Sequence, residues 1–243
     1  MKIIKYKKMS NNKYKVFLDN DDNIVLHENI IIKYNLLVNK EIFDLEEILD
    51  DNNKYLIYDM VLNYISIKMR CESEIREYLK KKNIDDEFSN DIINKLKQQG
   101  LINERLYTKS FISDKIRLNK YGINKIKNEL INLKIDKDII DQEIKKIDKE
   151  EIYINLEKLI DKKIKSNKSY AGEILKQRIL TDFINKGYSK EEILQILDNK
   201  NLDNDELYNK EYEKLYNKYS KKYTGSELEY YIKQKLYQKG LKK

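Results

Sequence analysis

The sequence predicts a mostly α-helical protein, an elongated array of tandem three-helix repeats behind a small N-terminal module that contains a β-hairpin. Three observations support this prediction. The 243 residues include no proline and only six glycines, so the residues that most often interrupt helices are scarce. From residue 44 onward, apolar residues recur at spacings of three and four, as on one face of an amphipathic helix. One pattern also returns at intervals of 51, 53 and 53 residues, which is typical of repeat proteins.

The N-terminal module is predicted from a local change of pattern. Polar and apolar residues alternate over 13–18, and an apolar stretch returns over 24–26, as in two strands. The Asp- and Asn-rich segment 19–23 predicts the turn between these strands. A short helix is expected near 28–34, and His27 at the strand end is expected to be a surface or packing residue.

Four segments end a helix in the same way and define the repeat. In each, apolar residues at the first position and four residues later form one stripe, and another apolar residue follows nine residues after the first. The segments are 75–84, 126–135, 179–188 and 232–241. Each repeat is predicted to hold three helices, with this segment in the second, and the fourth repeat lacks its third helix. The predicted domains are the module 1–52 and the repeats 53–102, 103–150, 151–201 and 202–243.

Five of the six glycines are placed in step with the repeat. The second helix is preceded by Gly122, Gly172 and Gly225 in the second, third and fourth repeats. Gly187 and Gly240 follow that helix, where a left-handed residue ends a helix at the least cost. We therefore expect glycine to mark the turns of this proline-free chain.

Composition argues against several classes of protein. Only Cys71 and His27 offer a thiolate or an imidazole, whereas a structural zinc site takes four such ligands, and a single cysteine cannot form an internal disulfide. No apolar stretch approaches the roughly 20 residues of a membrane helix. There is no phosphate-binding Gly-rich loop, and Cys71 has no nearby base. We expect no enzyme activity, no cofactor and no metal, and a cytoplasmic location because the first ten residues carry no export signal.

The net charge of +7 is distributed unevenly. Residues 1–58 carry −1, and residues 59–243 carry +8. A basic helical region is compatible with nucleic-acid contact, although a dedicated nucleic-acid clamp is usually more strongly basic on one face.

Three motifs follow one another within the helical region. The segment 69–76, Met-Arg-Cys-Glu-Ser-Glu-Ile-Arg, opens the second helix of the first repeat. The segment 101–107, Leu-Ile-Asn-Glu-Arg-Leu-Tyr, enters the second repeat, and Lys-Tyr-Gly at 120–122 precedes Ile126 and Glu-Leu at 129–130. This order, set within a three-helix period, resembles the RecX family, which are bacterial regulators of the RecA recombinase.

The first motif matches the family pattern with one departure. The family typically shows Arg-Ser-x-x-Glu-Leu, and this chain has Arg70, Glu74 and Ile75 at the corresponding positions. Cys71 replaces the family's serine. Because a thiol is a weak helix cap, Ser73 becomes the alternative start of this helix.

The resemblance covers roughly residues 55–200 and implies a non-enzymatic regulator. Such a protein would bind, as a monomer, the RecA filament on single-stranded DNA, and most family members inhibit ATP hydrolysis and strand exchange by RecA. An elongated array suits this task, since several weak contacts to successive subunits add up to tight binding. Two alternatives stay open: a DNA-binding helical repeat protein that acts independently of RecA, and a helical scaffold with neither activity.

The candidate partner-binding residues are cations. Arginine occurs five times against 44 lysines, so each arginine suggests a need for its planar set of donors. Basic helix ends and lysines beside the glycines are further candidates. The candidates for contact with RecA or DNA are Arg70, Arg76, Lys80, Lys81, Lys82, Arg105, Arg117, Lys120, Lys125, Lys162, Lys163 and Arg178.

Each of these candidates has a structural alternative. Arg70 could pair with Glu74 one turn along its own helix, and lysines 80–82 could form a solvated helix end that complements the helix dipole. Five tyrosines between residues 208 and 223 share one helix face and are predicted to pack in the core rather than stack on bases. Loops are expected to be braced by the tyrosines beside the glycines, Tyr121, Tyr170 and Tyr223.

Overall fold

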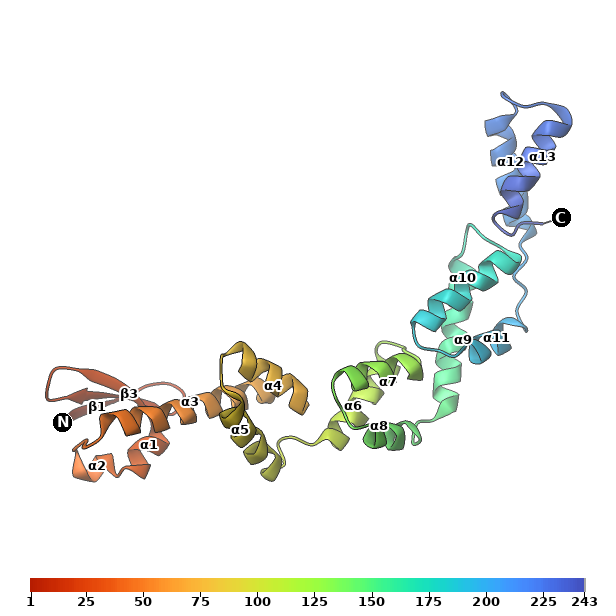
Figure 1. Cartoon of the computed structure of the whole chain (residues 1–243). Coiled ribbons are helices and arrows are strands. Elements are labelled where there is room, and N and C mark those ends of the chain that lie inside the picture. The colour runs from red at the N-terminus through yellow and green to blue at the C-terminus, as the bar shows by residue number, and fades with distance from the viewer. Residues whose placement is uncertain (243) are drawn as a thin grey trace. The chain divides into compact units, whose positions relative to one another are not determined.

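The computed structural model describes residues 1–242 (Figure 1). These residues form thirteen helices and one three-stranded antiparallel sheet. The chain divides into two compact units, Met1–Asn103 and Glu104–Lys243. The predicted fold class is confirmed, since helical repeats follow a small β-containing module. None of the helices within residues 1–242 is long and apolar enough to cross a membrane.

The N-terminal sheet has one strand more than the predicted hairpin. Its strands pair in chain order: β1 (Ile3–Lys8), β2 (Lys13–Leu18) and β3 (Asn23–His27). β2 and β3 are the expected hairpin, whereas β1 was not predicted because its three lysines interrupt the alternation of polar and apolar residues. Of this strand, only Ile3 is fully buried, and the Tyr6 hydroxyl donates a hydrogen bond to the Leu36 carbonyl at 2.8 Å.

Three helices complete the module: α1 (Glu28–Lys33), α2 (Leu36–Asn39) and α3 (Leu45–Ile67). α3 is 23 residues long and belongs to two cores. It contributes Ile48 to the core beneath the sheet and Val61 to the core of the first repeat. The boundary predicted between residues 52 and 53 therefore lies inside one continuous helix (Figure 1).

His27 joins the sheet to both neighbouring helices. Its side chain is buried, and Nδ1 accepts a hydrogen bond from the Asn29 backbone N–H at 3.1 Å, which caps α1. Nε2 lies 2.8 Å from Oδ2 of Asp59 in α3. Asn52, also buried, accepts from the His27 backbone N–H at 2.7 Å and donates to the Val25 carbonyl at 2.9 Å. His27 is thus a packing residue that also caps a helix.

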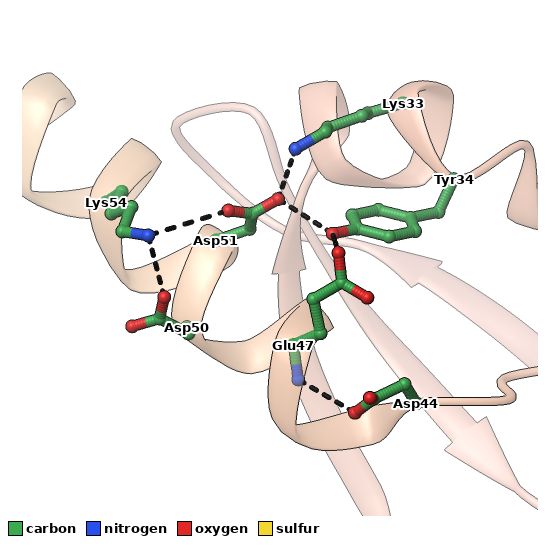
Figure 2. A network of polar contacts seen from close by, with 7 residues as sticks. All are labelled: Lys33, Tyr34, Asp44, Glu47, Asp50, Asp51 and Lys54. Atoms are coloured by element: carbon green, nitrogen blue, oxygen red, sulfur yellow. Dashed lines mark hydrogen bonds and ion pairs between the residues drawn. The ribbon is translucent and has the colours of Figure 1, made fainter.

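A polar network fixes the end of α1 against α3 (Figure 2). The Asp51 carboxylate accepts hydrogen bonds from the Lys33 ammonium and, at 2.7 Å, from the Tyr34 hydroxyl. Glu47 Oε1 lies 3.2 Å from the same hydroxyl, and Lys54 Nζ lies 3.8 Å from the second Asp51 oxygen. The hydrogen bonds from Lys33 and Tyr34 lower the pKa of Asp51, so the carboxylate form is favoured in the folded chain.

The four repeat segments occupy equivalent places in the structure. The repeats add the helices α4 (Glu72–Lys81), α5 (Asp86–Gln98), α6 (Glu104–Arg117), α7 (Ile123–Asn132), α8 (Lys137–Ile144), α9 (Lys149–Ser166), α10 (Gly172–Asn185), α11 (Lys190–Leu197), α12 (Asp205–Tyr219) and α13 (Gly225–Tyr237). The first apolar residues are all fully buried: Ile75, Ile126, Ile179 and Ile232. The last residue of each segment donates its backbone N–H to the carbonyl five residues earlier, at 3.0–3.2 Å. The residue directly before this donor has a left-handed backbone, with φ of 58, 59, 91 and 76° at Asn83, Lys134, Gly187 and Gly240. Each segment thus closes its helix with the same hydrogen-bonded cap.

The prediction that Gly122 shares a position with Gly172 and Gly225 is wrong. Gly122 is the N-cap of α7, with φ of −77°, and stands four residues before Ile126. Gly172 and Gly225 are the first residues of α10 and α13, with φ of 48 and 57°, and stand seven residues before their repeat isoleucines. The reason is that α10 and α13 begin about one turn earlier than α7.

Gly122 and Gly187 bring the second and third repeats into backbone contact. The Gly122 N–H donates to the Lys186 carbonyl at 2.9 Å, and the Asn124 N–H donates to the Gly187 carbonyl at 3.0 Å. A Cβ atom placed on Gly122 would lie 2.3 Å from the Gly187 carbonyl carbon and oxygen. No side chain fits between the two backbones.

The third and fourth repeats meet in a similar way. The Ala171 N–H donates to the Lys239 carbonyl at 2.9 Å. A Cβ atom on Gly240 would lie 2.0 Å from the Ala171 carbonyl oxygen. Glycine at the helix end of one repeat therefore permits close approach to the loop of the preceding repeat.

The expected shift of the α4 start to Ser73 is wrong, because Cys71 is the N-cap. Cys71 has an extended backbone, and its N–H donates to Glu74 Oε2 at 3.1 Å. The Cys71 thiol is buried and lies 3.2 Å from the Ser73 hydroxyl. The carboxylate of Glu74 satisfies the backbone donor at the helix start, as in one half of a capping box.

The tyrosines of the last repeat mostly pack in its core, as predicted. Tyr208, Tyr212, Tyr219 and Tyr223 lie against the buried residues of α12 and α13. Of the five tyrosines predicted to share one helix face, Tyr216 is exposed over 46% of its surface, and Tyr223 lies beyond the end of α12. Tyr230 and Tyr237 of α13 are also exposed.

Candidate functional site

Arg70 is held inside the fold. Its Nη1 donates to Glu74 Oε1 at 3.1 Å, and its guanidinium centre lies 4.1 Å from the centroid of the Tyr64 ring. Only 15% of the side chain is exposed. Arg70 itself lies just before α4, outside any helix, and it forms the alternative pair with Glu74 that the sequence allowed. A partner would have to compete with Glu74 for the Arg70 guanidinium.

Arg76 links α4 to α5. Its Nε donates to Glu72 Oε1 at 2.8 Å, and its Nη1 donates to Asn90 Oδ1 at 2.8 Å. Lys97 of α5 contacts the other Glu72 oxygen at 2.5 Å. These contacts give Arg76 a structural role within the first repeat, and 42% of its side chain remains exposed.

The three lysines at the end of α4 differ in their surroundings. Lys81 pairs with Glu77 at 2.6 Å, one turn earlier in the helix. Lys80 and Lys82 are exposed and form no ion pair with the carboxylates of residues 1–242. Lys80 and Lys82 therefore remain available to an external anion.

Two arginines of α6 also contact carboxylates. Arg105 Nε lies 3.2 Å from Oε1 of Glu143 in α8, which also receives Lys146 Nζ at 2.6 Å. The Glu143 side chain is 4% exposed. The Arg117 side chain is 69% exposed, against 57% for Arg105, and its Nε lies 3.7 Å from Glu151 Oε1, which is itself 40% exposed. Arg105 and Glu143 thus join α6 to α8, whereas the Arg117 pair is loose.

We expect Glu143→Gln to lower the free energy of unfolding by about 1–2 kcal/mol at pH 7, since hydrogen bonds between charged groups are lost. The hydrogen bond from Lys146, with a further contribution from Arg105, lowers the pKa of Glu143. The carboxylate therefore stabilises the fold above its unfolded pKa, and this contribution is lost as the pH falls through the lowered folded pKa. Urea unfolding of both proteins between pH 7 and pH 3 should show the difference shrinking with acidity, and a difference independent of pH would contradict this assignment.

The loop before α7 holds two more candidates. Lys120 is left-handed, with φ of 53°, and its carbonyl accepts a hydrogen bond from the Tyr188 hydroxyl at 3.0 Å. Burial raises the pKa of Tyr188 to about 12, so this hydroxyl remains a donor at neutral pH. Lys125 Nζ lies 4.0 Å from the centroid of the Tyr121 ring.

α9 and α10 enclose an open groove of about 560 Å³, here named the α9–α10 groove. It brings together Lys163 and Arg178, whereas Lys162 on the same helix does not line it. Lys163 pairs across the groove with Asp182 at 2.7 Å. The Arg178 guanidinium lies 3.7 Å from the centroid of the Tyr170 ring. The groove thus brings two of the candidate cations to one hollow.

One recurring contact was not predicted from the sequence. In the last three repeats, the residue directly before the repeat isoleucine contacts the tyrosine of the preceding loop. The pairs are Lys125 with Tyr121, Arg178 with Tyr170 and Tyr231 with Tyr223, the last at 5.0 Å between ring centroids. The three tyrosines brace their loops as predicted, and the repeat register alone could have identified their partners.

Comparison with known proteins places the chain in one family. The model described as "RecX, first three-helix domain" matches residues 58–96, and the model described as "RecX, second three-helix domain" matches residues 103–143. These ranges cover α4 and most of α5 in the first repeat, and α6, α7 and nearly all of α8 in the second.

Curated relatives agree over nearly the whole length. The regulatory protein RecX of Lactococcus lactis subsp. lactis (strain IL1403) is 35% identical over 235 residues, which cover 91% of this chain and 86% of that protein. The regulatory protein RecX of Streptococcus thermophilus (strain CNRZ 1066) is 29% identical, with 99% and 95% covered.

Solved structures share the fold. A crystal structure of a regulatory protein RecX superimposes with a TM-score of 0.65 at 24% identity and covers 81% of this chain and 98% of that one. The structure of RecX from Lactobacillus salivarius gives a TM-score of 0.55 at 23% identity, with 61% and 96% covered. The repeat, the cation-bearing loops and these relatives lead to one conclusion: the chain belongs to the RecX family of regulatory proteins.

Proposed function

We propose that this chain binds the filament that the RecA recombinase forms on single-stranded DNA, and that it slows ATP hydrolysis and strand exchange by RecA. Membership of a family of regulatory proteins carries the proposal, since the relatives share the chain over almost its full length. The protein acts by binding, as a monomer in the cytoplasm, without catalysis of its own.

The distribution of cations supports this proposal. Lys80 and Lys82 in the first repeat, Lys125 in the second and Arg178 in the third contact no carboxylate within residues 1–242, so each of the first three repeats offers positive charge to a partner. A polymeric partner, whether protein filament or DNA strand, presents repeated acidic groups, and several such contacts add up even when each is weak.

The test is hydrolysis of ATP by RecA from the same organism on single-stranded DNA, with the purified full chain added at well below one copy per RecA monomer. The rate of phosphate release is expected to fall. A chain that alters neither hydrolysis, filament assembly nor strand exchange would contradict the proposal.

A pull-down with RecA, with and without single-stranded DNA and nucleotide, separates the two open alternatives. Retention that requires the assembled filament supports the proposal. Tight binding to duplex DNA without RecA, with a steep dependence on salt, would favour a DNA-binding repeat protein that acts alone. A helical scaffold with neither activity would be retained neither on the RecA filament nor on duplex DNA.

A further inference from the structure

The five arginines of the chain fall into two groups. Arg70, Arg76, Arg105 and Arg117 each lie within 4 Å of a carboxylate. Among residues 1–242, no carboxylate approaches Arg178 that closely, and its contact is the Tyr170 ring. A guanidinium stacked on an aromatic face keeps its in-plane N–H donors free. Arg178 therefore has hydrogen-bonding capacity that the fold does not use.

The loop that carries Tyr170 is fixed by local hydrogen bonds. Asn167, at the end of α9, accepts from the backbone N–H groups of Ser169 and Tyr170 at 3.3 and 3.2 Å. Its amide nitrogen donates to the Tyr170 carbonyl at 2.5 Å. Because the loop is closed in this way, the Tyr170 ring is positioned before any ligand arrives, and the Arg178 side chain stacked on it is oriented too.

The remaining lining of the α9–α10 groove suits an oxyanion. Lys163, Lys168 and Arg178 face one acid, Asp182, so the lining carries a net charge of +2. Lys168 forms no ion pair with any group of residues 1–242. Ser169 and Tyr170, which both carry a hydroxyl group, belong to the same lining. Arginine, lysine, serine and tyrosine side chains are the usual contacts to phosphate oxygens in nucleic-acid complexes.

We infer that the α9–α10 groove is a direct binding site for the phosphodiester backbone of single-stranded DNA, with Arg178 and Lys168 as its principal donors. The groove is open and much larger than one phosphate group, which fits a continuous strand rather than a closed small-molecule site. This inference rests on the proposed function only in taking single-stranded DNA as a partner. It needs no contact with RecA.

The test measures binding of a fluorescein-labelled dT20 oligonucleotide to the full chain without RecA, by fluorescence anisotropy in 50 mM salt. Arg178→Gln is expected to raise the dissociation constant about tenfold, which corresponds to about 1.4 kcal/mol for a charged hydrogen bond to phosphate. The slope of log K against log salt should fall by about 0.7, as for one phosphate contact to a single strand. Lys168→Gln, a change at an exposed lysine that leaves the fold intact, should weaken binding about threefold, as expected for a flexible point charge.

The matched control is Lys176→Gln, which removes one positive charge from the same helix. Lys176 is held by Asp198 at 2.9 Å and does not line the groove, so its removal should change dT20 binding less than twofold. Circular dichroism of each variant verifies folding.

Absence of dT20 binding by the unsubstituted chain would overturn the inference, as would unchanged binding by both groove variants. Equal weakening by Lys176→Gln would also overturn it, since only general charge would then matter. Normal dT20 binding by Arg178→Gln together with lost inhibition of RecA would assign the groove to a protein partner instead. Conversely, Arg178-dependent dT20 binding by a chain that leaves RecA unaffected would uphold the site and contradict the proposed function.

Discussion

Gly187→Ala is expected to lower the free energy of unfolding of the unit Glu104–Lys243 by about 3–5 kcal/mol, from left-handed strain, steric overlap and weakened hydrogen bonds together. Gly187 has φ of 91°, which L side chains rarely adopt. An added Cβ would lie 2.4 Å from the Lys125 backbone nitrogen and 2.8 Å from the Gly122 carbonyl oxygen. The contact between the second and third repeats would have to open. Urea unfolding followed by circular dichroism measures the loss.

Two further alanine variants separate the causes. Gly122 has ordinary φ but the same close contact, so Gly122→Ala tests steric overlap alone, at an expected cost of about 2–3 kcal/mol. Gly225 has φ of 57° and open space around it, so Gly225→Ala tests left-handed strain alone, at about 1–2 kcal/mol. If all three variants lost the same stability, the close packing of the two backbones would not be what glycine provides here.

His27→Ala is expected to destabilise the unit Met1–Asn103 by about 2–4 kcal/mol, the combined cost of a lost helix cap and of a cavity in place of a buried ring. Nδ1 accepts a hydrogen bond from the Asn29 N–H, and Nε2 lies 2.8 Å from Oδ2 of Asp59. The ring also stacks on Tyr55 at 5.7 Å between centroids. The melting temperature and urea midpoint of the full chain report the change.

His27→Asn serves as the matched control for the cap. The asparagine side chain can accept the same Asn29 N–H, although it fills less space and does not reach Asp59. It should recover about 1 kcal/mol of the loss. An asparagine variant no more stable than the alanine variant would mean that the cap contributes nothing.

Helix periodicity and the spacing of the repeat were sufficient to predict the helical architecture. Ile75, Ile126, Ile179 and Ile232 are fully buried, as their positions in the four segments require. β1 could not be predicted, because only Ile3 faces the core fully and the strand exists by pairing with β2. The third strand is therefore a tertiary effect rather than a local one.

The candidate site was predictable in kind but not in detail. Scarcity of arginine singled out residues that have defined contacts in the structure, but Arg70 and Arg105 use those contacts within the fold. Only side-chain geometry distinguishes them from Arg178, which lines a groove and lies against the Tyr170 ring. The Gly122–Gly187 contact was likewise beyond the sequence, since it joins residues 65 positions apart and depends on how two repeats pack.

The continuity of α3 has an evolutionary consequence. A single inserted or deleted residue near its middle would rotate Ile48 relative to Val61 by about 100° and shift them by about 1.5 Å along the axis. One of the two cores would then lose its apolar contact with α3. Insertions and deletions are therefore tolerable in the loops on either side of α3 but not within it, and the number of residues between Ile48 and Val61 must stay constant for the N-terminal module and the first repeat to fold together.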